Sequence, residues 1–153
     1  MGLLTFKGGI HPNDGKSLAK DKAIVEVLPE GDLVFPLSQH IGAPAAPIVK
    51  VGDQVLKGQK IAEAGGFVSA PVYSSVSGKV KAIAPYFTPT GGKVSSIIVE
   101  NDGAYTEAER LSTRPLEMLS KEEILNLIAE AGIVGMGGAG FPTRVKLSPK
   151  EPE

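Results

Sequence analysis

The sequence contains no cysteine, and its only two histidines lie far apart, at positions 11 and 40. Without a thiol, the chain can form no disulfide and can offer no thiolate to zinc or to an iron–sulfur cluster within these residues. Two separated histidines also make a metal site unexpected. We therefore predict that the chain carries no metal ligand set and no catalytic residue of its own.

The sequence also lacks an excess of charge of either sign. Lys and Arg number 16 and Asp and Glu number 17, which gives a formal net charge of −1. Proteins bind nucleic acids largely through clustered Lys and Arg that neutralise phosphates. The near balance therefore predicts that nucleic acid is not a partner.

Long apolar runs are missing too. A membrane-spanning helix needs about 20 consecutive apolar residues, and Met1–Lys7 fit neither a signal peptide nor a myristoylation signal. We expect a soluble, cytoplasmic chain. What is present is a core-forming apolar fraction of 42% with 19 Gly and 12 Pro, which favours short strands joined by tight turns over a helical bundle.

A β pattern extends from Ala23 to Asn101, where short runs rich in Val and Ile alternate with turn signals such as Gly52-Asp53 and Lys57-Gly58. Glycine supplies the positive φ that such turns require. The pattern predicts strands at 23–28, 32–37, 47–51, 54–56, 60–64, 78–84 and 94–100.

One helix is predicted near the carboxyl end. Ser120 is a good N-cap, Glu123 completes a capping box, and Gly132 stands where a C-terminal glycine belongs. The polar stretch before this helix carries Pro115 and is predicted to be a linker. We therefore expect a domain over 1–105, a linker over 106–119 and the start of a second domain over 120–153.

The rhythm of residues 49–64, with Gly-Asp at one turn and Lys-Gly at the next, resembles that of biotinyl and lipoyl carrier domains, which are barrel-sandwich hybrids. The match covers about Pro47 to Pro85. A carrier presents one lysine on a hairpin tip, but the corresponding segment, 65–75, contains none. The fold is therefore predicted without the carrier activity. The alternative is that these are ordinary turns of some other β protein.

A glycine-rich loop follows the predicted helix, with five glycines among residues 132–140. Such loops let backbone N–H groups converge on an anion, because no Cβ intervenes. Pro142 suits the first turn of a short helix, and Lys146 could then meet a phosphate. The loop lacks the Gly-Lys-Ser/Thr of a P-loop, and a helix rather than a strand precedes it, unlike in a Rossmann site. A plain glycine linker is the remaining alternative.

The loop from Gly135 to Thr143 together with Lys146 resembles the flavin- and NADH-binding loop of the 51-kDa-type component of respiratory complex I. It is closer still to the RnfC component of the Rnf electron transport complexes. The stretches 6–12 and 36–45 also resemble RnfC, as does the order of sandwich first and glycine loop second. The resemblance covers nearly the whole chain and implies a mainly β fold: a barrel-sandwich hybrid, one helix and the glycine-rich start of a truncated α/β flavin- and nucleotide-binding domain.

The resemblance also implies a function. A complete RnfC holds FMN and NAD(H), and its carboxyl-terminal part binds two 4Fe–4S clusters. It passes electrons between ferredoxin and NAD⁺ in a membrane complex that moves Na⁺ or H⁺, as a peripheral subunit on the cytoplasmic side with the other Rnf subunits as partners. The cofactor-binding residues that carry over are Gly135, Gly137, Gly138, Gly140, Phe141, Thr143 and Lys146.

Several expectations concern this chain by itself. Because most of the flavin-binding fold is absent, we expect it to be inactive alone, to bind no cofactor tightly and to be poorly ordered over 135–153. The alternative function is a non-enzymatic docking domain of carrier-like fold without a redox role, and a third possibility is an acylated carrier. His11 and His40 are each predicted to hydrogen-bond a loop carbonyl, the alternatives being to position a redox partner or to sense pH. Phe67 and Tyr73 could dock a neighbouring domain or close the end of the core.

Overall fold

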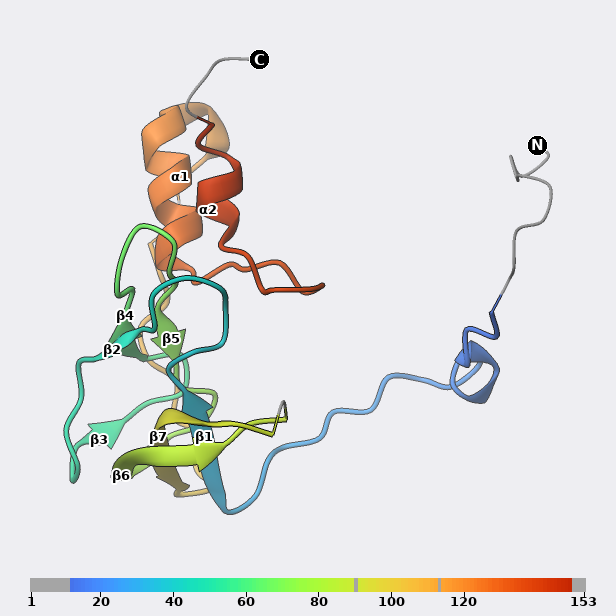
Figure 1. Cartoon of the computed structure of the whole chain (residues 1–153), viewed down its shortest axis with the longest axis vertical. Coiled ribbons are helices and arrows are strands. Elements are labelled where there is room, and N and C mark those ends of the chain that lie inside the picture. Colours follow the sequence, from blue (N-terminus) through green and yellow to red (C-terminus); the bar gives the residue numbers. More distant parts are fainter. Residues whose placement is uncertain (1–11, 90, 113, 150–153) are drawn as a thin grey trace.

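Two antiparallel sheets form the body of the molecule, two helices stand at one end of it, and an arm leads away from it (Figure 1). The structure is a computed structural model and describes residues 12–89, 91–112 and 114–149. The first sheet has the spatial order β1 (Asp32–Pro36), β7 (Lys93–Asn101), β6 (Gly78–Phe87), β3 (Gln54–Val55). The second has the order β2 (Ala46–Pro47), β4 (Lys60–Glu63), β5 (Val72–Tyr73). The predicted mainly β architecture is confirmed.

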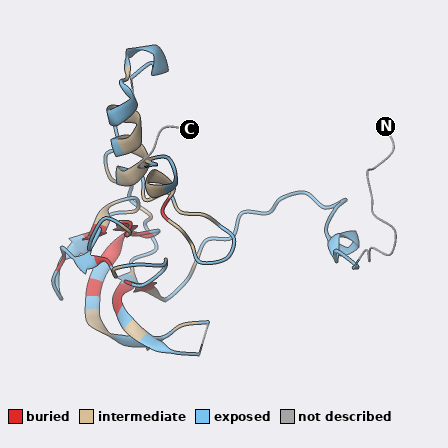
Figure 2. Cartoon of the chain, turned by 45° about the horizontal axis from the view of Figure 1, so that its top comes forward, coloured by how far each residue is buried: buried red, intermediate tan, exposed pale blue. Residues whose placement is uncertain are grey.

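Figure 2 shows that the buried residues gather in the sheets. Ile61 of β4 and Ile97 of β7 are completely buried, and Phe35 of β1 joins them in one core. The rest of this core consists of Leu37, Ala45, Val49, Val55, Ala62, Val72, Val76, Val80 and Val99. Because both sheets contribute to it, burial of these aliphatic side chains holds the sheets together.

Gly78 marks the start of β6, beside β7. A Cβ at this position would lie 2.0 Å from the carbonyl oxygen of Glu100. Only a residue without a side chain allows this approach, so the Ser77-Gly78 turn signal in the sequence has a packing reason as well as a conformational one.

Five of the predicted strands are present as β1, β3, β4, β6 and β7, with their ends shifted. The strand predicted at 47–51 is reduced to β2, because the chain turns early. The Asp53 carboxylate accepts from the N–H of Lys50 at 2.8 Å, and the N–H of Asp53 donates to the carbonyl of Lys50 at 3.1 Å. β5 was not predicted, since two residues flanked by Pro71 and Ser74 form too short a run to give a pattern.

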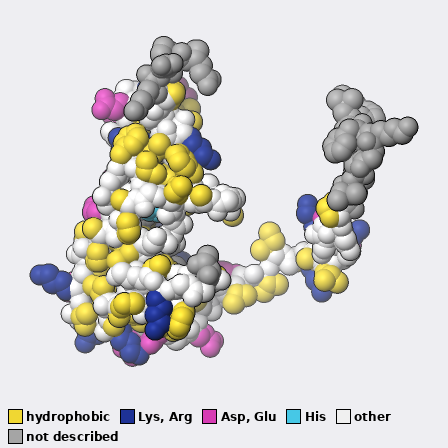
Figure 3. All heavy atoms as spheres, viewed as in Figure 1, with side chains coloured by type: hydrophobic (Ala, Val, Ile, Leu, Met, Phe, Trp, Pro, Cys, Tyr) yellow, Lys and Arg dark blue, Asp and Glu magenta, His cyan; other side chains and the backbone are white. Residues whose placement is uncertain are grey.

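The strand predicted at 23–28 is wrong. This segment lies in the arm that leads away from the sheets, and it pairs with no strand in the described part of the chain (Figure 1). Ile24 is 102% exposed and Val27 is 82% exposed, and Figure 3 shows apolar side chains along the arm. The alternation of residue types fits a strand, but β structure also needs a neighbouring edge that no local pattern supplies.

The carboxyl-terminal part contains α1 (Lys121–Glu130) and the short α2 (Thr143–Lys146), and shorter 3-10 turns lie at Lys16–Leu18 and Leu116–Met118. The predicted capping box at the start of α1 is present: Ser120 Oγ accepts from the N–H of Glu123, and the Glu123 carboxylate accepts from the N–H of Ser120. Gly132 follows the helix with φ of 65°, as a C-terminal glycine should. Neither helix contains a buried residue, so α1 rests on the body without entering its core.

The capping box predicts a pH dependence for α1. Hydrogen bonds from the backbone N–H of Ser120, from Arg114 and from the Ser120 hydroxyl lower the pKa of Glu123 from 4.5 to about 2. Since the folded-state pKa is depressed, this contribution to helix stability is present above about pH 4.5 and is lost as the pH falls toward about 2. Amide exchange of α1 followed across that range should report the loss.

In the Glu123→Gln variant, this acid-induced step should disappear. The matched control is Glu122→Gln, which removes a carboxylate from the same turn but leaves the capping box intact, and it should keep the wild-type profile. An unchanged acid step in Glu123→Gln would contradict the assignment.

The segment predicted as a linker, 106–119, begins as part of the body. The N–H of Lys57 donates to the carbonyl of Thr106 at 2.9 Å, and the N–H of Ala108 donates back to the carbonyl of Lys57 at 2.8 Å. Among the described residues, no helix has both the length and the apolar character needed to cross a bilayer. The same residues contain no cluster of three or more His, Asp or Glu side chains placed to hold a metal ion.

Candidate functional site

The glycine loop is closed at its base by a short antiparallel bridge between Val134 and Pro142. The N–H of Gly135 donates to the carbonyl of Phe141 at 2.9 Å, and the N–H of Thr143 donates to the carbonyl of Ile133 at 3.0 Å. The bridge and α2 thus give this segment hydrogen-bond partners nearby in the chain. The poor order expected over 135–153 stays a prediction, and residues 150–153 lie outside the described part of the chain.

The tip of the loop presents backbone N–H groups to solvent. Met136, Gly137, Gly138 and Ala139 are all exposed. In residues 12–89, 91–112 and 114–149, no protein acceptor takes a hydrogen bond from these four amides. Gly138 has φ of 63° and Gly140 has φ of 60°, a left-handed conformation that glycine adopts at little cost. Consecutive amides left free in this way can converge on an anionic group.

Lys146 lies beside this loop, because α2 turns the chain back toward it. Its ammonium nitrogen is 3.5 Å from the position that a Cβ on Gly135 would occupy and 5.9 Å from the centre of the Phe141 ring. Gly135 therefore leaves room for the lysine, and the aromatic ring favours a cation near its face. The structure brings together a loop of free amides and one positive charge.

The other predicted site residues take different positions around the loop. Gly137 is at the open tip, with nothing within 4 Å of a Cβ added there. Thr143 is half-buried at the start of α2. Gly140 faces the body rather than the solvent, since a Cβ on it would lie 2.9 Å from the carbonyl oxygen of Gln39. Gly135, Phe141 and Lys146 thus lie close to one another at the base of the loop, and Gly140 serves a contact that the sequence did not predict.

A seam joins the body to the carboxyl-terminal elements, and in the described part of the chain hydrogen bonds and ion pairs cross it at two places. At the first, the N–H of Ile41 donates to the carbonyl of Ala139 at 2.9 Å. At the second, the Tyr73 hydroxyl donates to the carbonyl of Glu130, and the Lys60 ammonium pairs with the Glu130 carboxylate. Tyr73 therefore docks α1, one of the two roles expected for it, whereas Phe67 is 63% exposed.

Electrostatics keeps the second contact point in one protonation state. Burial raises the pKa of the Tyr73 phenol. Burial disfavours the charged form of Lys60, but hydrogen bonds to Glu130 and Glu63 outweigh it and raise the pKa of the Lys60 ammonium. Both Tyr73 and Lys60 therefore keep their protons at neutral pH.

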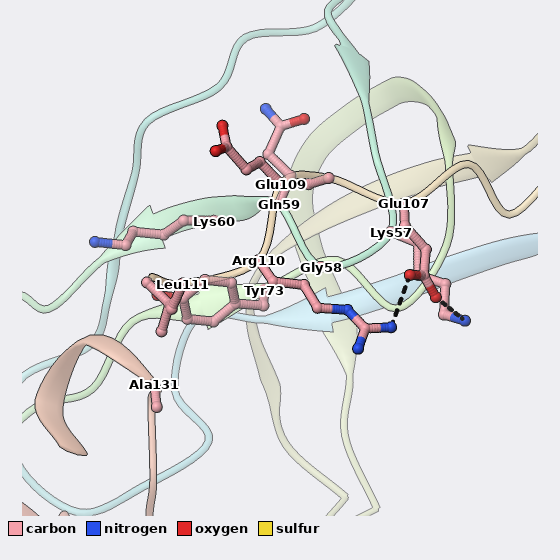
Figure 4. Close-up of a pocket in the computed structure, with 11 residues that line it drawn as sticks. Lys57, Gly58, Gln59, Lys60, Tyr73, Glu107, Glu109, Arg110, Leu111 and Ala131 are labelled. Atoms are coloured by element: carbon pink, nitrogen blue, oxygen red, sulfur yellow. Dashed lines mark hydrogen bonds and ion pairs between the residues drawn. The ribbon is translucent and has the colours of Figure 1, made fainter. Parts of the chain in front are cut away.

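A groove of about 760 Å³ runs along the body next to this contact (Figure 4). Three of its charged side chains pair with one another: Glu107 accepts from Lys57 at 3.3 Å and from Arg110 at 3.1 Å, as the dashed lines in Figure 4 show. Hydrogen bonds from Arg110, which has the larger effect, and from Lys57 lower the pKa of the Glu107 carboxyl. Because these charges are paired with each other, we do not place the anion site in this groove.

The segment where a carrier domain would present its lysine begins close to the loop before β2. A Cβ on Gly65, in the segment after β4, would lie 2.0 Å from the carbonyl oxygen of Pro44. Residues 63–67 are nevertheless exposed. The segment differs from a carrier tip in containing no lysine, and the loss of carrier activity stays a prediction.

His40 makes the hydrogen bond to a loop carbonyl that the sequence analysis predicts. Its Nδ1 lies 3.0 Å from the carbonyl oxygen of Ile41, the next residue along the chain, so it hydrogen-bonds a loop carbonyl as predicted. His11 lies outside the described residues. The seam contacts of residues 39–41 were missed from the sequence, and the only signal for them was a stretch rich in Gly and Pro around His40.

The fold and the loop together define a class of protein: a carrier-like sandwich without a lysine in the segment 65–75, followed by a glycine loop whose tip has free amides. Residues 4–104 match the family model described as the RnfC barrel sandwich hybrid domain. The chain belongs to this family, which confirms both the predicted barrel-sandwich hybrid and the resemblance.

Curated relatives extend the match across the glycine loop. The chain is 50% identical over 149 residues to the C component of the proton-translocating ferredoxin:NAD(+) oxidoreductase complex of Clostridium ljungdahlii. This match covers 96% of this chain and 32% of the relative. The chain is 44% identical over 147 residues to the Na(+)-translocating counterpart of Acetobacterium woodii, covering 94% of this chain and 33% of the relative. The C component of the ion-translocating oxidoreductase complex of Rhodobacter capsulatus is 44% identical over 147 residues, or 94% of this chain and 28% of the relative. The chain thus spans about a third of the length of these relatives.

Proposed function

We propose that this chain is the sandwich and glycine-loop part of an electron-transfer subunit in an ion-translocating ferredoxin:NAD⁺ oxidoreductase. The names of the relatives support this, since they describe the C component of such complexes with either H⁺ or Na⁺ as the ion moved. The partners proposed are the other subunits of the complex, ferredoxin and NAD(H). We propose that the protein lies on the cytoplasmic face of the membrane as a peripheral subunit.

Within that subunit, we propose that the glycine loop binds a phosphate group of FMN or NAD(H). The observation that carries this is the set of free amides at 136–139 with Lys146 beside them. Amide donors and a nearby ammonium are the groups that proteins use to bind phosphate. Flavin or nicotinamide, once bound, supplies the electron and hydride chemistry, while the loop residues of this chain bind and orient its anionic end.

The residues of this chain do not fit an iron–sulfur cluster. The sequence contains no cysteine, and such clusters are held by cysteine thiolates. The two 4Fe–4S clusters proposed for the whole protein therefore need ligands from outside these residues. The proposed division into a sandwich over 1–105, a linker over 106–119 and a nucleotide-binding part from 120 onward follows the same scheme.

Replacing Lys146 by alanine should weaken binding of FMN to the chain by about threefold to tenfold, since an exposed charge-assisted contact contributes modestly. Titration of FMN followed by flavin fluorescence measures the dissociation constant, which we expect to be in the millimolar range. Lys121→Ala removes an equal charge at the start of α1, away from the loop, and should leave the constant unchanged. Equal losses in both variants would indicate a general charge effect and argue against the site.

A further inference from the structure

The body contacts the tip of the glycine loop through one short segment, Gln39–Ile41. The N–H of Ile41 donates to the carbonyl of Ala139 at 2.9 Å. The backbone at Gly140 approaches so closely that a Cβ there would lie 2.9 Å from the carbonyl oxygen of Gln39 and 3.3 Å from the Cα of His40. Ala139 immediately follows Gly138, so the contact is made at the tip itself and not at the base of the loop.

The His40 side chain holds this segment in place. Its Nε2 accepts from the N–H of Ala70 at 3.0 Å, and the same nitrogen lies 3.3 Å from the Ala70 carbonyl oxygen. An imidazole nitrogen that accepts carries no proton, so in the neutral ring the proton is on Nδ1. Nδ1 then donates to the carbonyl of Ile41 at 3.0 Å. Ala70 is only 5% exposed, so its N–H depends on this ring for a partner.

These bonds form one continuous connection from the body to the loop. It runs from the Ala70 amide through the imidazole to the Ile41 carbonyl, and from the Ile41 amide to the Ala139 carbonyl. The bond from the imidazole holds the Ile41–Gly42 peptide group, which adjoins the peptide group that carries the Ile41 N–H. That N–H in turn holds the Ala139 carbonyl. The next amides toward the amino terminus are those of the free set at 136–139.

We propose that His40 is a positioning residue for the glycine loop, through which the sandwich holds the amides at 136–139 in the arrangement that receives an anionic group. The sandwich is then a structural support for the site and not only a docking module. The positioning itself stands on the contacts above, whereas its consequence for a phosphate ligand rests on the proposed function.

The test compares variants of the ¹⁵N-labelled chain without any ligand. In His40→Ala, we expect the Ile41 amide, which donates to the Ala139 carbonyl, to exchange about tenfold faster. The amides of Gly137, Gly138 and Ala139 should change their chemical shifts and lose order on the ps–ns timescale as the tip loses its support. Gln39→Ala is the matched control: it removes a hydrogen bond from the Gln39 side chain to the Pro36 carbonyl in the same segment but leaves the imidazole connection intact, and the loop should not respond.

A conservative variant separates positioning from plain stability. In His40→Asn, the side-chain amide can still donate to the Ile41 carbonyl in the place of Nδ1, while the acceptor for Ala70 is lost. We expect the order of the loop to be largely restored in this variant although Ala70 exchanges quickly. If His40→Ala is too unstable to study, two other variants can be compared instead. His40→Asn keeps the donor to Ile41, whereas the longer side chain in His40→Gln can reach Ala70 but not Ile41.

The positioning role is overturned if the amides at 136–139 are unchanged in His40→Ala, or if loop order follows Ala70 rather than Ile41 across the variants. Inorganic pyrophosphate then tests the ligand step: wild type should show shifts at 136–139, and His40→Ala should need about ten times more pyrophosphate. If the loop amides change in His40→Ala but pyrophosphate shifts none of them in the wild-type chain, the proposed function is wrong and the positioning role is still supported.

Discussion

Gly140→Ala is expected to separate the glycine loop from the sandwich and to weaken anion binding by at least about tenfold. Gly140 has φ of 60°, a conformation that costs a residue with a Cβ roughly 1–2 kcal/mol. The added Cβ would also lie 2.9 Å from the backbone oxygen of Gln39, which cannot rotate away as a side-chain end could. The bond between the Ile41 amide and Ala139 should therefore break, and faster exchange of the Ile41 amide measures this directly.

Gly137→Ala is the control for this prediction. A Cβ at Gly137 meets nothing within 4 Å, so the seam and the protection of the Ile41 amide should be preserved. Pyrophosphate affinity is measured in parallel for both variants. If Gly140→Ala keeps both the protected Ile41 amide and the wild-type affinity, the seam is not what holds the loop.

Ile97→Ala should lower the free energy of unfolding of the sandwich by about 2–5 kcal/mol, the usual range for removing a buried isoleucine. Ile97 is completely buried in β7, the strand paired with both β1 and β6. The loss combines the transfer free energy of the deleted methylene and methyl groups with the cavity they leave. Urea unfolding measures it, and a drop of this size is a large fraction of the stability of a small domain.

Ile48→Ala makes the same chemical change at a side chain that is 52% exposed, just after β2. Its effect should stay below about 1 kcal/mol, because little area leaves water there. Equal losses at the two positions would mean that the sheets do not enclose the core described here.

Local signals in the sequence were sufficient for most of the body and for α1. The strands β1, β4, β6 and β7 were recognised because each forms a run of several residues between Gly or Pro turns. The capping box at Ser120 fixed the start of α1, since both of its bonds lie within four residues. The segment 23–28 has equally good alternation but no partner edge, and this shows that the pattern reports on side chains and not on pairing.

The candidate site was predicted in its residues but not in its arrangement. Glycine density indicated where backbone could approach another group, but not which group. Gly137 faces solvent, whereas Gly140 faces the Gln39 carbonyl, and the two glycines cannot be distinguished in the sequence. The contact of Ile41 with Ala139 joins residues far apart in the chain, so no local pattern contains it.

Binding of an anionic phosphate group by the free amides at the tip of the glycine loop is the step on which the proposed function depends. Titrating the ¹⁵N-labelled chain with pyrophosphate and with FMN, and following every backbone amide, tests it most directly. Shifts at 136–139 that saturate with both ligands, with little change across the sandwich strands, are the predicted result. Shifts confined to other surfaces, or an unchanged spectrum at millimolar concentrations of either ligand, would contradict it.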